Sequence, residues 1–242
     1  PGRIICGAVG NDAKRKIHMM KEFTETDTLV RSFAHFYYKS PRQVTIDMWG
    51  EFNKNFDDIL KENPAELLGP KGKMRILVKI LDSGIRLPAQ THPDKEFSKA
   101  HFDSEYGKTE SWYILGTRPG ANLYFGFKEG GTREDFEKAI DDSETNMDAM
   151  EELMCAIEPK VGEMYLVPAK TVHAIGKGCL ILEIQEPTDF TIQPERWCGE
   201  YRLSDEEMYL GLSRADAVSC FNFGETPKSK ILIDAGNSTK YI

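Results

Sequence analysis

The sequence predicts a mainly β protein with short helical insertions. Its apolar residues gather in short runs that are rich in Val, Ile, Leu and aromatic side chains, and Pro and Gly residues separate these runs. The apolar spacing of a helix occurs in only two stretches, near 50–69 and 132–157. With 242 residues and 40% hydrophobic residues, the chain is long enough to bury a sizeable core, and we expect one domain over residues 1–242.

The first half of the chain predicts strands around one helical segment. Scattered aromatic and β-branched residues over 16–50 indicate strands, and "EFNKNFDDILKENPAELLG" at 51–69 has helical spacing that ends at a glycine. The nearly continuous apolar run "MRILVKILD" at 74–82 is typical of a buried strand, although it contains Lys79. "SWYILG" and "NLYFGF", joined by "TRPGA", predict two strands of one hairpin.

The second half predicts a helical insert followed by more strands. Residues 132–157 combine acidic residues with apolar residues at helical spacing, which predicts two short helices. Short strands separated by Pro and Gly then follow from 162 to 192. "AVSCFNF" at 217–223 and "KILIDAG" at 230–236 also indicate strands. These either complete the barrel or begin a second β-domain that a truncated chain does not finish. The first residue is Pro rather than Met, so we expect a processed or fragmentary N-terminus.

Charge and cysteine content narrow the class of partner. A formal net charge of −8 argues against nucleic acid and against an anionic membrane surface. The apolar runs are too short to span a bilayer, and we find no signal-peptide pattern at the N-terminus. The five cysteines lie far apart without a C-x-x-C pair, which favours reduced thiols. We therefore expect a cytoplasmic protein that acts on a small molecule.

Four residues of metal-ligand type stand out in the β-rich segments. Gln90 and His92 are two residues apart, so their side chains lie on the same face of an extended segment, and Glu110 follows. His173 comes at the start of a later predicted strand, after a turn at Pro168. This nitrogen and oxygen set suits zinc, with manganese, iron or cobalt as competitors, and it can leave a position open for water or substrate. Taken singly, each histidine would more often be an ordinary hydrogen-bonded residue.

Three motifs in order carry a resemblance to a known family. "Q-x-H-P-D", "E-Y-G-K-T-E-x-W-Y" and "V-P-A-x-T-V-H-A-I-G-K-G-x-L-I-L-E-I-Q" resemble the class I mannose-6-phosphate isomerases, in their shorter bacterial form, from about residue 50 to 192. The resemblance implies a cupin double-stranded β-helix, the jelly-roll barrel. It also implies a zinc-dependent aldose-ketose isomerase whose metal ligands are Gln90, His92, Glu110 and His173.

The resemblance also suggests residues that act on the substrate. It implies that Lys108 lies in the active site and that Lys79 lies near the substrate phosphate. Glu183, on the strand "LILEIQ", and Lys108 are the two candidates for the proton carrier, because a buried carboxyl or a lysine beside a dication can have a shifted pKa. Each lysine also has a simpler explanation: Lys79 could be a structural lysine and Lys108 a solvated loop charge.

Two positions depart from the family pattern. Where the family has an arginine that faces the substrate, "TDFTIQPERW" has Gln193, which leaves Arg196, three residues later and beyond Pro194, as a cation that could reach the pocket. Where the family has a serine that helps to hold phosphate, this chain has Pro88, which offers neither a hydroxyl nor an N–H. The predicted reaction interconverts mannose 6-phosphate and fructose 6-phosphate through an enediol.

Other functions stay open on the sequence alone. The departures at Gln193 and Pro88 leave room for a metal-containing, sugar-binding cupin that has lost or altered catalysis, such as a sensor or an accessory domain. An iron-dependent cupin oxygenase fits the ligands, but it does not explain the second and third motifs. No GxSxG elbow, P-loop or dinucleotide-binding GxGxxG turn occurs in the sequence, which argues against the common hydrolase and nucleotide-binding classes.

Overall fold

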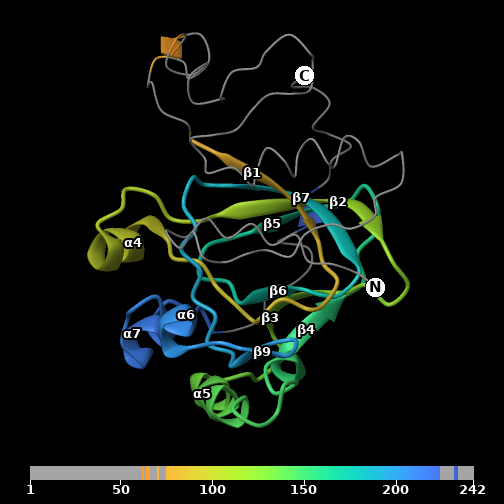
Figure 1. Cartoon of the computed structure of the whole chain (residues 1–242), viewed down its shortest axis with the longest axis vertical. Helices are drawn as coiled ribbons and strands as arrows, with labels where there is room; N and C mark the ends of the chain where they lie inside the picture. The colour runs from red at the N-terminus through yellow and green to blue at the C-terminus, as the bar shows by residue number, and fades with distance from the viewer. Residues whose placement is uncertain (1–61, 63, 66–69, 71–74, 224–231, 234–242) are drawn as a thin grey trace.

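The described part of the chain is built mainly from short antiparallel strands. The computed structural model describes residues 62, 64–65, 70, 75–223 and 232–233 (Figure 1). The strands are β1 (Leu77–Asp82), β2 (Glu110–Thr117), β3 (Leu123–Phe127), β4 (Met154–Ile157), β5 (Met164–Val167), β6 (His173–Ile175), β7 (Cys179–Gln185), β8 (Trp197–Cys198), β9 (Tyr201–Arg202) and β10 (Leu232–Ile233). The helices are α4 (Lys95–Phe102), α5 (Arg133–Asp142), the 3-10 turn η3 (Glu151–Leu153), α6 (Asp205–Tyr209) and α7 (Arg214–Ser219).

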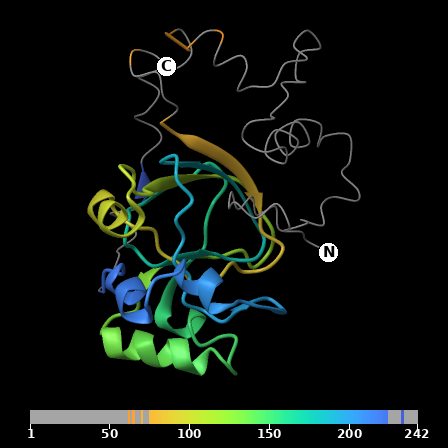
Figure 2. The same cartoon turned by 60° about the vertical axis from the view of Figure 1, so that its left-hand side comes forward.

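Two antiparallel sheets form the body of the fold. The larger has the strand order β1-β7-β2-β5-β10, and the smaller has the order β4-β3-β6. Figures 1 and 2 show the two sheets curving around a common interior. Buried side chains of both sheets meet there in one apolar cluster, with Trp112, Tyr165 and Ile181 from the larger sheet and Phe125 and Ile175 from the smaller. The predicted mainly β class is confirmed.

Several strands that follow one another along the chain lie in different sheets, such as β2 and β3, or β6 and β7. β2 pairs with β5 and β7, whereas β3 pairs with β4 and β6, so the predicted hairpin of "SWYILG" and "NLYFGF" is wrong. The connection from β2 to β3 crosses between the sheets, and the connection from β6 to β7 crosses beside it. The N–H of Gly176 donates to the carbonyl of Asn122 (2.9 Å), which joins the two crossings. A short loop with Pro and Gly fits a hairpin and a crossing equally well, and long-range pairing chose the crossing.

The run at 74–82 gives β1, but this strand is not buried on both faces. Its side chains alternate between the two sides, so that Lys79 and Leu81 are buried while Val78 is 38% exposed. β1 pairs with β7 along its length, from Leu77 opposite Gln185 to Asp82 opposite Leu180. Among the described residues it is an edge strand of the larger sheet.

The helices α5, α6 and α7 cover the outer side of the smaller sheet (Figure 2). A second apolar cluster joins them to it, with Phe136 of α5, Met208 of α6 and Val218 of α7 packed together with Phe127 and Met154 of the sheet. α5 begins with a capping box in which Thr132 and Asp135 satisfy each other's backbone N–H groups. The predicted helix near 132 is therefore a cover for the barrel.

Three predicted elements differ from the structure. The second helix expected within 132–157 is only the 3-10 turn η3, and residues 154–157 form β4. "AVSCFNF" was expected to be a strand, but residues 217–219 are the end of α7, because Ser213 caps a helix whose Ala217 and Val218 are buried. The strand expected in "KILIDAG" is confirmed for Leu232–Ile233, which pairs with β5.

The remaining predictions lie largely or wholly outside the described residues. Residues 62, 64 and 65 are helical, within the segment expected to be helical at 51–69, and the other residues of that segment are not described. The strands expected within 16–50 also lie outside the described residues. None of the helices in the described part of the chain is both long and apolar enough to cross a membrane.

Candidate metal centre and active site

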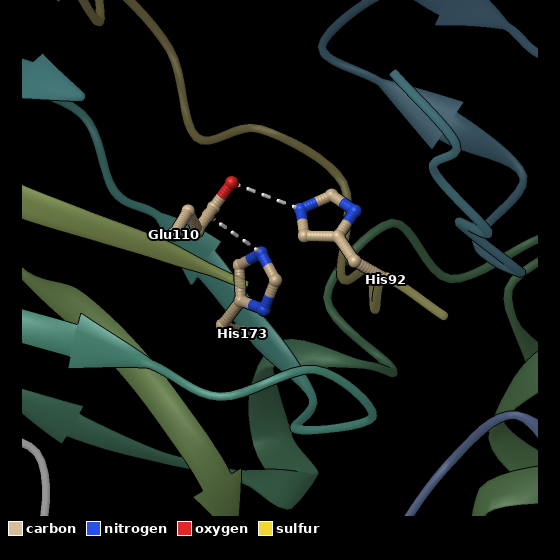
Figure 3. A group of neighbouring side chains, drawn as sticks. All are labelled: His92, Glu110 and His173. Atoms are coloured by element: carbon tan, nitrogen blue, oxygen red, sulfur yellow. Dashed lines mark ion pairs between the residues drawn. The ribbon is translucent and has the colours of Figure 1, made fainter. Parts of the chain in front are cut away.

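His92, Glu110 and His173 come together inside the barrel (Figure 3). Glu110 is the first residue of β2, His173 is the first residue of β6, and His92 lies in the segment that precedes α4. Oε2 of Glu110 lies 3.3 Å from Nε2 of His92, and Oε1 of Glu110 lies 3.4 Å from Nε2 of His173. All three residues are at most 2% exposed. The three ligand atoms lie within 4.8 Å of one another, which is close enough for one metal ion to bind all three.

Backbone pairing brings the segment of His92 to the start of β6. Gln90 and His173 exchange two backbone hydrogen bonds, each of 2.9 Å, in an isolated β-bridge. Thr91 forms a second bridge with Ile192 on its other side. The backbone of Gln90 is therefore paired with that of His173. That the side-chain amide of Gln90 is a fourth metal ligand stays a prediction.

Both histidines present Nε2 to the carboxylate. Nδ1 of His92 lies 2.9 Å from the carbonyl of Phe190, and Nδ1 of His173 lies 2.9 Å from the carbonyl of Thr171. Because a carbonyl oxygen only accepts hydrogen bonds, Nδ1 carries the proton in each ring. Nε2 is then the bare nitrogen, which is the form that binds a metal.

Burial keeps both rings neutral. Burial and the neighbouring His92 lower the pKa of His173 to about 3. Burial and the nearby ammonium group of Lys108 also lower the pKa of His92 below its usual 6.5. Neutral imidazoles with fixed tautomers are ready to act as metal ligands without first losing a proton.

Lys108 lies directly against the three candidate ligands. Its Nζ is 2.9 Å from Nε2 of His92 and 3.1 Å from Oε2 of Glu110, and the residue is 4% exposed. Burial acts to raise the pKa of Glu110, but its neighbours, with Lys108 first among them, hold it well below 4.5. The ligand group therefore carries a negative charge and already attracts one cation.

Gly107 explains why Lys108 can approach so closely. A Cβ atom at Gly107 would lie 2.7 Å from the carbonyl oxygen of Pro93, so any side chain there would clash with the backbone next to His92. The N–H of Lys108 donates to the same carbonyl (2.9 Å). The glycine in the "EYGKTE" motif thus allows two backbone segments to touch and places the lysine beside the histidine.

A second buried group of charges joins β1 to β7. Nζ of Lys79 lies 2.9 Å from Oδ1 of Asp189 and 3.3 Å from Oε2 of Glu183. Nε1 of Trp112 donates to Oε1 of Glu183 (3.3 Å), and the ring of Trp112 packs edge-on against that of His173. Burial, and after it the charge of Glu110, raises the pKa of Glu183. A buried carboxyl with a raised pKa beside a metal-type site is suited to moving a proton.

The residues present fit a divalent metal. Among the described residues, Nε2 of His173 is buried without a hydrogen-bond partner, and the buried Oε2 of Glu110 has an ion pair with Lys108 but no hydrogen bond. Buried polar atoms without partners are costly, and a metal ion bound between them would satisfy both. Two imidazoles and one carboxylate form the donor set of several catalytic zinc sites.

The structure does not bring Arg196 or Gln193 to this group. Arg196 pairs through Nε with Glu144 (2.6 Å) and through Nη2 with Asp205 (2.9 Å), and Nη1 donates to the carbonyl of Leu203. The amide of Gln193 donates to the carbonyl of Glu207 in α6 (3.2 Å). Both side chains therefore bind the helical cover on the outer side of the smaller sheet, which does not support their predicted roles at the substrate.

Sequence reasoning did not identify some residues that shape the site. The two imidazoles are oriented by the backbone carbonyl groups of Phe190 and Thr171. Because every residue has a backbone carbonyl, the sequence does not reveal these contacts. Asp189 lies in the quoted segment "TDFTIQPERW", yet its contact with Lys79 depends on a pairing between segments 110 residues apart. Arg86 and Glu195 lie outside the three quoted motifs.

Comparison with known proteins gives several relatives with one activity in their names. The chain is 39% identical over 139 residues to the probable mannose-6-phosphate isomerase GmuF of Bacillus subtilis, a match that covers 57% of this chain and 42% of the relative. It is 39% identical over 176 residues to the mannose-6-phosphate isomerase ManA of the same organism, covering 66% and 54%. A mannose-6-phosphate isomerase of Streptococcus mutans is 37% identical over 116 residues, covering 48% and 34%. The chain thus spans about half or less of the length of these relatives.

Solved structures agree with these relatives. A crystal structure of the mannose 6-phosphate isomerase from Bacillus subtilis superposes with a TM-score of 0.56 at 28% identity, covering 69% of this chain and 51% of that one. A zinc-bound mannose 6-phosphate isomerase has the same fold, with a TM-score of 0.56 at 15% identity over 74% of this chain and 63% of that one. No family model matches the chain. The matched part of the chain is therefore homologous to proteins named mannose-6-phosphate isomerase, and its described residues have their cupin fold.

Proposed function

We propose that the chain is a metal-dependent aldose-ketose isomerase that interconverts mannose 6-phosphate and fructose 6-phosphate. The observation that carries the proposal is the buried group of His92, Glu110 and His173, in which both Nε2 atoms face the carboxylate. Relatives at 37–39% identity are named for this activity and support the choice of substrate.

Zinc is the metal that we propose for the site. His92, Glu110 and His173 would hold it, with Gln90 as the fourth ligand, and the zinc-bound structure with the same fold supports this assignment. When bound, the ion supplies Lewis-acid stabilisation of the negative charge that develops on the sugar oxygens. The neutral imidazoles suit a dication, and Glu110 offsets part of its charge.

Glu183 is the residue that we propose as the proton carrier. The reaction removes a proton from C2 of the sugar and returns one to C1 through an enediol, so it needs a group that can hold a proton near neutral pH. The raised pKa of Glu183 fits this task. Lys79, at 3.3 Å, would steady the carboxylate as it gains and loses its proton.

Lys108 would act on the substrate oxygens. Its ammonium group already lies among the ligand atoms, where it can donate hydrogen bonds to an oxygen that gains negative charge. The predicted phosphate contact of Lys79 stays a prediction, because its Nζ is already bound to two carboxylates. The substrate is expected to be a small phosphosugar and the location the cytoplasm.

Isomerase assays of the purified full chain with added zinc test the proposal. We expect turnover of mannose 6-phosphate, and we expect His173→Ala to abolish both turnover and stoichiometric zinc binding. Glu183→Gln should keep zinc and lose about 10²–10⁴-fold in kcat, as expected when a general acid or base is removed. Glu134→Gln, on the exposed face of α5, is the control and should behave like the wild type.

A chain that binds one zinc per molecule and does not turn over the sugar would contradict the proposal. This result would favour the alternative, a sugar-binding cupin without isomerase activity. Gln193 and Pro88, which replace an arginine and a serine of the family pattern, would then be the first residues to exchange.

A further inference from the structure

Arg86 and Glu195 form a buried ion pair beside the candidate metal centre. Nη1 of Arg86 lies 2.9 Å from Oε2 of Glu195, and Nη2 lies 2.5 Å from Oε1, so the two groups meet in a bidentate pair. Glu195 is completely buried, and the side chain of Arg86 is 15% exposed. The pair raises the pKa of Arg86 despite its burial, which keeps the guanidinium charged.

The same carboxylate binds the backbone next to the first candidate ligand. Oε2 of Glu195 also accepts a hydrogen bond from the N–H of Ala89 (2.5 Å), and Ala89 is 0% exposed. Ala89 directly precedes Gln90, whose N–H and carbonyl both pair with His173. The carboxylate of Glu195 is therefore connected to the backbone of His173 through the hydrogen bond to Ala89, the peptide bond from Ala89 to Gln90, and the hydrogen bonds of Gln90.

The segment that carries Gln90 and His92 needs such support. It belongs to no long strand. Its backbone forms two isolated bridges, Gln90 with His173 and Thr91 with Ile192, and the carbonyl of His92 accepts a hydrogen bond from the N–H of Lys170 (2.7 Å). The N–H of Gln90 points to β6, where it donates to the carbonyl of His173, so the N–H of the adjacent Ala89 points the other way and finds its acceptor in Glu195. Without this carboxylate the buried N–H would lack a charged acceptor.

Arg86 connects this segment to the helical cover as well. Its Nε lies 2.9 Å from Oε2 of Glu151, and Nη2 donates to the carbonyl of Met147 (3.2 Å). The hydroxyl of Tyr124 donates to the other oxygen of Glu151 (2.7 Å). The guanidinium thus holds Glu195 from one side, while Glu151 and the carbonyl groups of Met147 and Leu87 hold the guanidinium.

We propose that Glu195, held by Arg86, is a positioning residue of the metal centre. Its carboxylate fixes the backbone at Ala89 and so sets where Gln90 and His92 lie relative to His173. Groups that orient metal ligands without binding the metal commonly change metal affinity or activity by about 10–100-fold when they are removed. The inference rests on the proposed function for the identity of the metal, but not for the effect on the backbone.

The first test is Glu195→Gln in the full chain, measured without metal by amide hydrogen exchange. We expect exchange to become faster in peptides that cover 87–92 and 173–175 and to stay unchanged in α5. Asp82→Asn is the control, because Asp82 also forms a bidentate pair, with Arg118 (2.6 and 2.9 Å), and has no contact with residues 87–92 among the described residues. Its exchange in 87–92 should equal that of the wild type.

The second test is zinc affinity, measured by competition with a chromogenic chelator. Glu195→Gln should weaken zinc binding by about 10–100-fold, whereas Asp82→Asn should leave it unchanged. Arg86→Lys keeps the charge but loses the bidentate contact, so we expect smaller changes in zinc affinity and in exchange over the same peptides. If Glu195→Gln does not fold, the zinc affinity and amide exchange of Arg86→Lys test the positioning role instead.

Two results would overturn the inference. One is exchange that rises equally over the whole chain, and the other is unchanged zinc affinity in a folded Glu195→Gln protein, because both would mean a role in stability alone. A wild-type chain that binds no zinc would contradict the proposed function instead. The exchange measurement would still decide between a local and a general effect of Glu195.

Discussion

His173 shows how its surroundings fix the state of one side chain. Its ring is completely buried, its Nδ1 proton is donated to the carbonyl of Thr171, and its Nε2 faces Glu110. Burial and the neighbouring His92 lower its pKa to about 3. The folded chain therefore holds this imidazole in its neutral form at every pH at which enzymes of metabolism work.

This low pKa predicts how the stability of the metal-free chain depends on pH. Below about pH 6.5 the unfolded chain takes up a proton at His173 that the folded chain does not, so the stabilisation present above that pH is lost as the pH falls towards 3. One proton corresponds to a slope of about 1.4 kcal/mol per pH unit. His173→Gln should show a smaller slope between pH 6 and 4, measured by urea unfolding with a chelator present.

Two features make this comparison specific. The pKa of Glu183 is raised, so its contribution has the opposite sign, and the difference between wild type and variant removes it. Between pH 7 and 8 the two proteins should have the same slope. Parallel stability curves from pH 7 to 4 would show that His173 is protonated in the folded state, contrary to the low pKa.

The sequence predicted the residues of the site better than their roles. His92, Glu110 and His173 were expected from motifs alone, and the structure brings them together. Arg196 was expected to turn towards the pocket, but it pairs with Glu144 and Asp205. A motif fixes where a residue lies along the chain, whereas the direction of a long side chain depends on partners from other segments, which no local pattern shows.

At the scale of the elements, the decisive feature is the paired crossing between the sheets. The connections from β2 to β3 and from β6 to β7 lie against each other, and Gly176 lies where they touch. A Cβ atom at Gly176 would lie 2.1 Å from the carbonyl oxygen of Asn122. Only glycine allows the two backbones to approach this closely.

Gly176→Ala should therefore destabilise the fold. The added methyl group forces one crossing away from the other, and we expect a loss of about 1–3 kcal/mol in the free energy of unfolding, as for other overpacked sites. Gly116→Ala is the control, because a Cβ atom there would meet Leu180 at an ordinary distance of 3.6 Å. Equal unfolding midpoints for the two variants in urea would contradict the close approach.

The strands themselves were easier to predict than their partners. β1, β2, β3 and β7 lie where the apolar runs predicted strands. The hairpin of β2 and β3 was wrong because each strand finds its neighbours far away in the sequence, such as β7 for β2. Periodicity records which face of a strand is buried, but it holds no information on which strand lies beside it.

At the scale of the whole molecule, the metal centre joins parts of the chain that are otherwise distant. Glu110 belongs to the larger sheet, His173 to the smaller sheet, and His92 to the segment between β1 and α4. A ligand that binds all three side chains binds only the folded chain, because unfolding separates them.

Zinc should therefore raise the thermal stability of the chain. At a free zinc concentration 100 times the Kd, the gain is about 2.7 kcal/mol, which corresponds to a rise in Tm of roughly 5–10 °C for a chain of this length. Differential scanning calorimetry with and without a chelator measures this shift. His173→Ala should show almost none of it, and an equal shift in wild type and variant would mean that zinc binds elsewhere.

The position of β7 between β1 and β2 has a consequence for synthesis on the ribosome. β7 is the last of the three to be made, yet β1 reaches the rest of the described sheet only through it. Until Gln185 has left the ribosome, β1 and β2 have open edges and apolar faces, which are the features that draw nascent chains into aggregates. We therefore expect the nascent chain to need a chaperone, or rapid completion of the sheet, until β7 has been made.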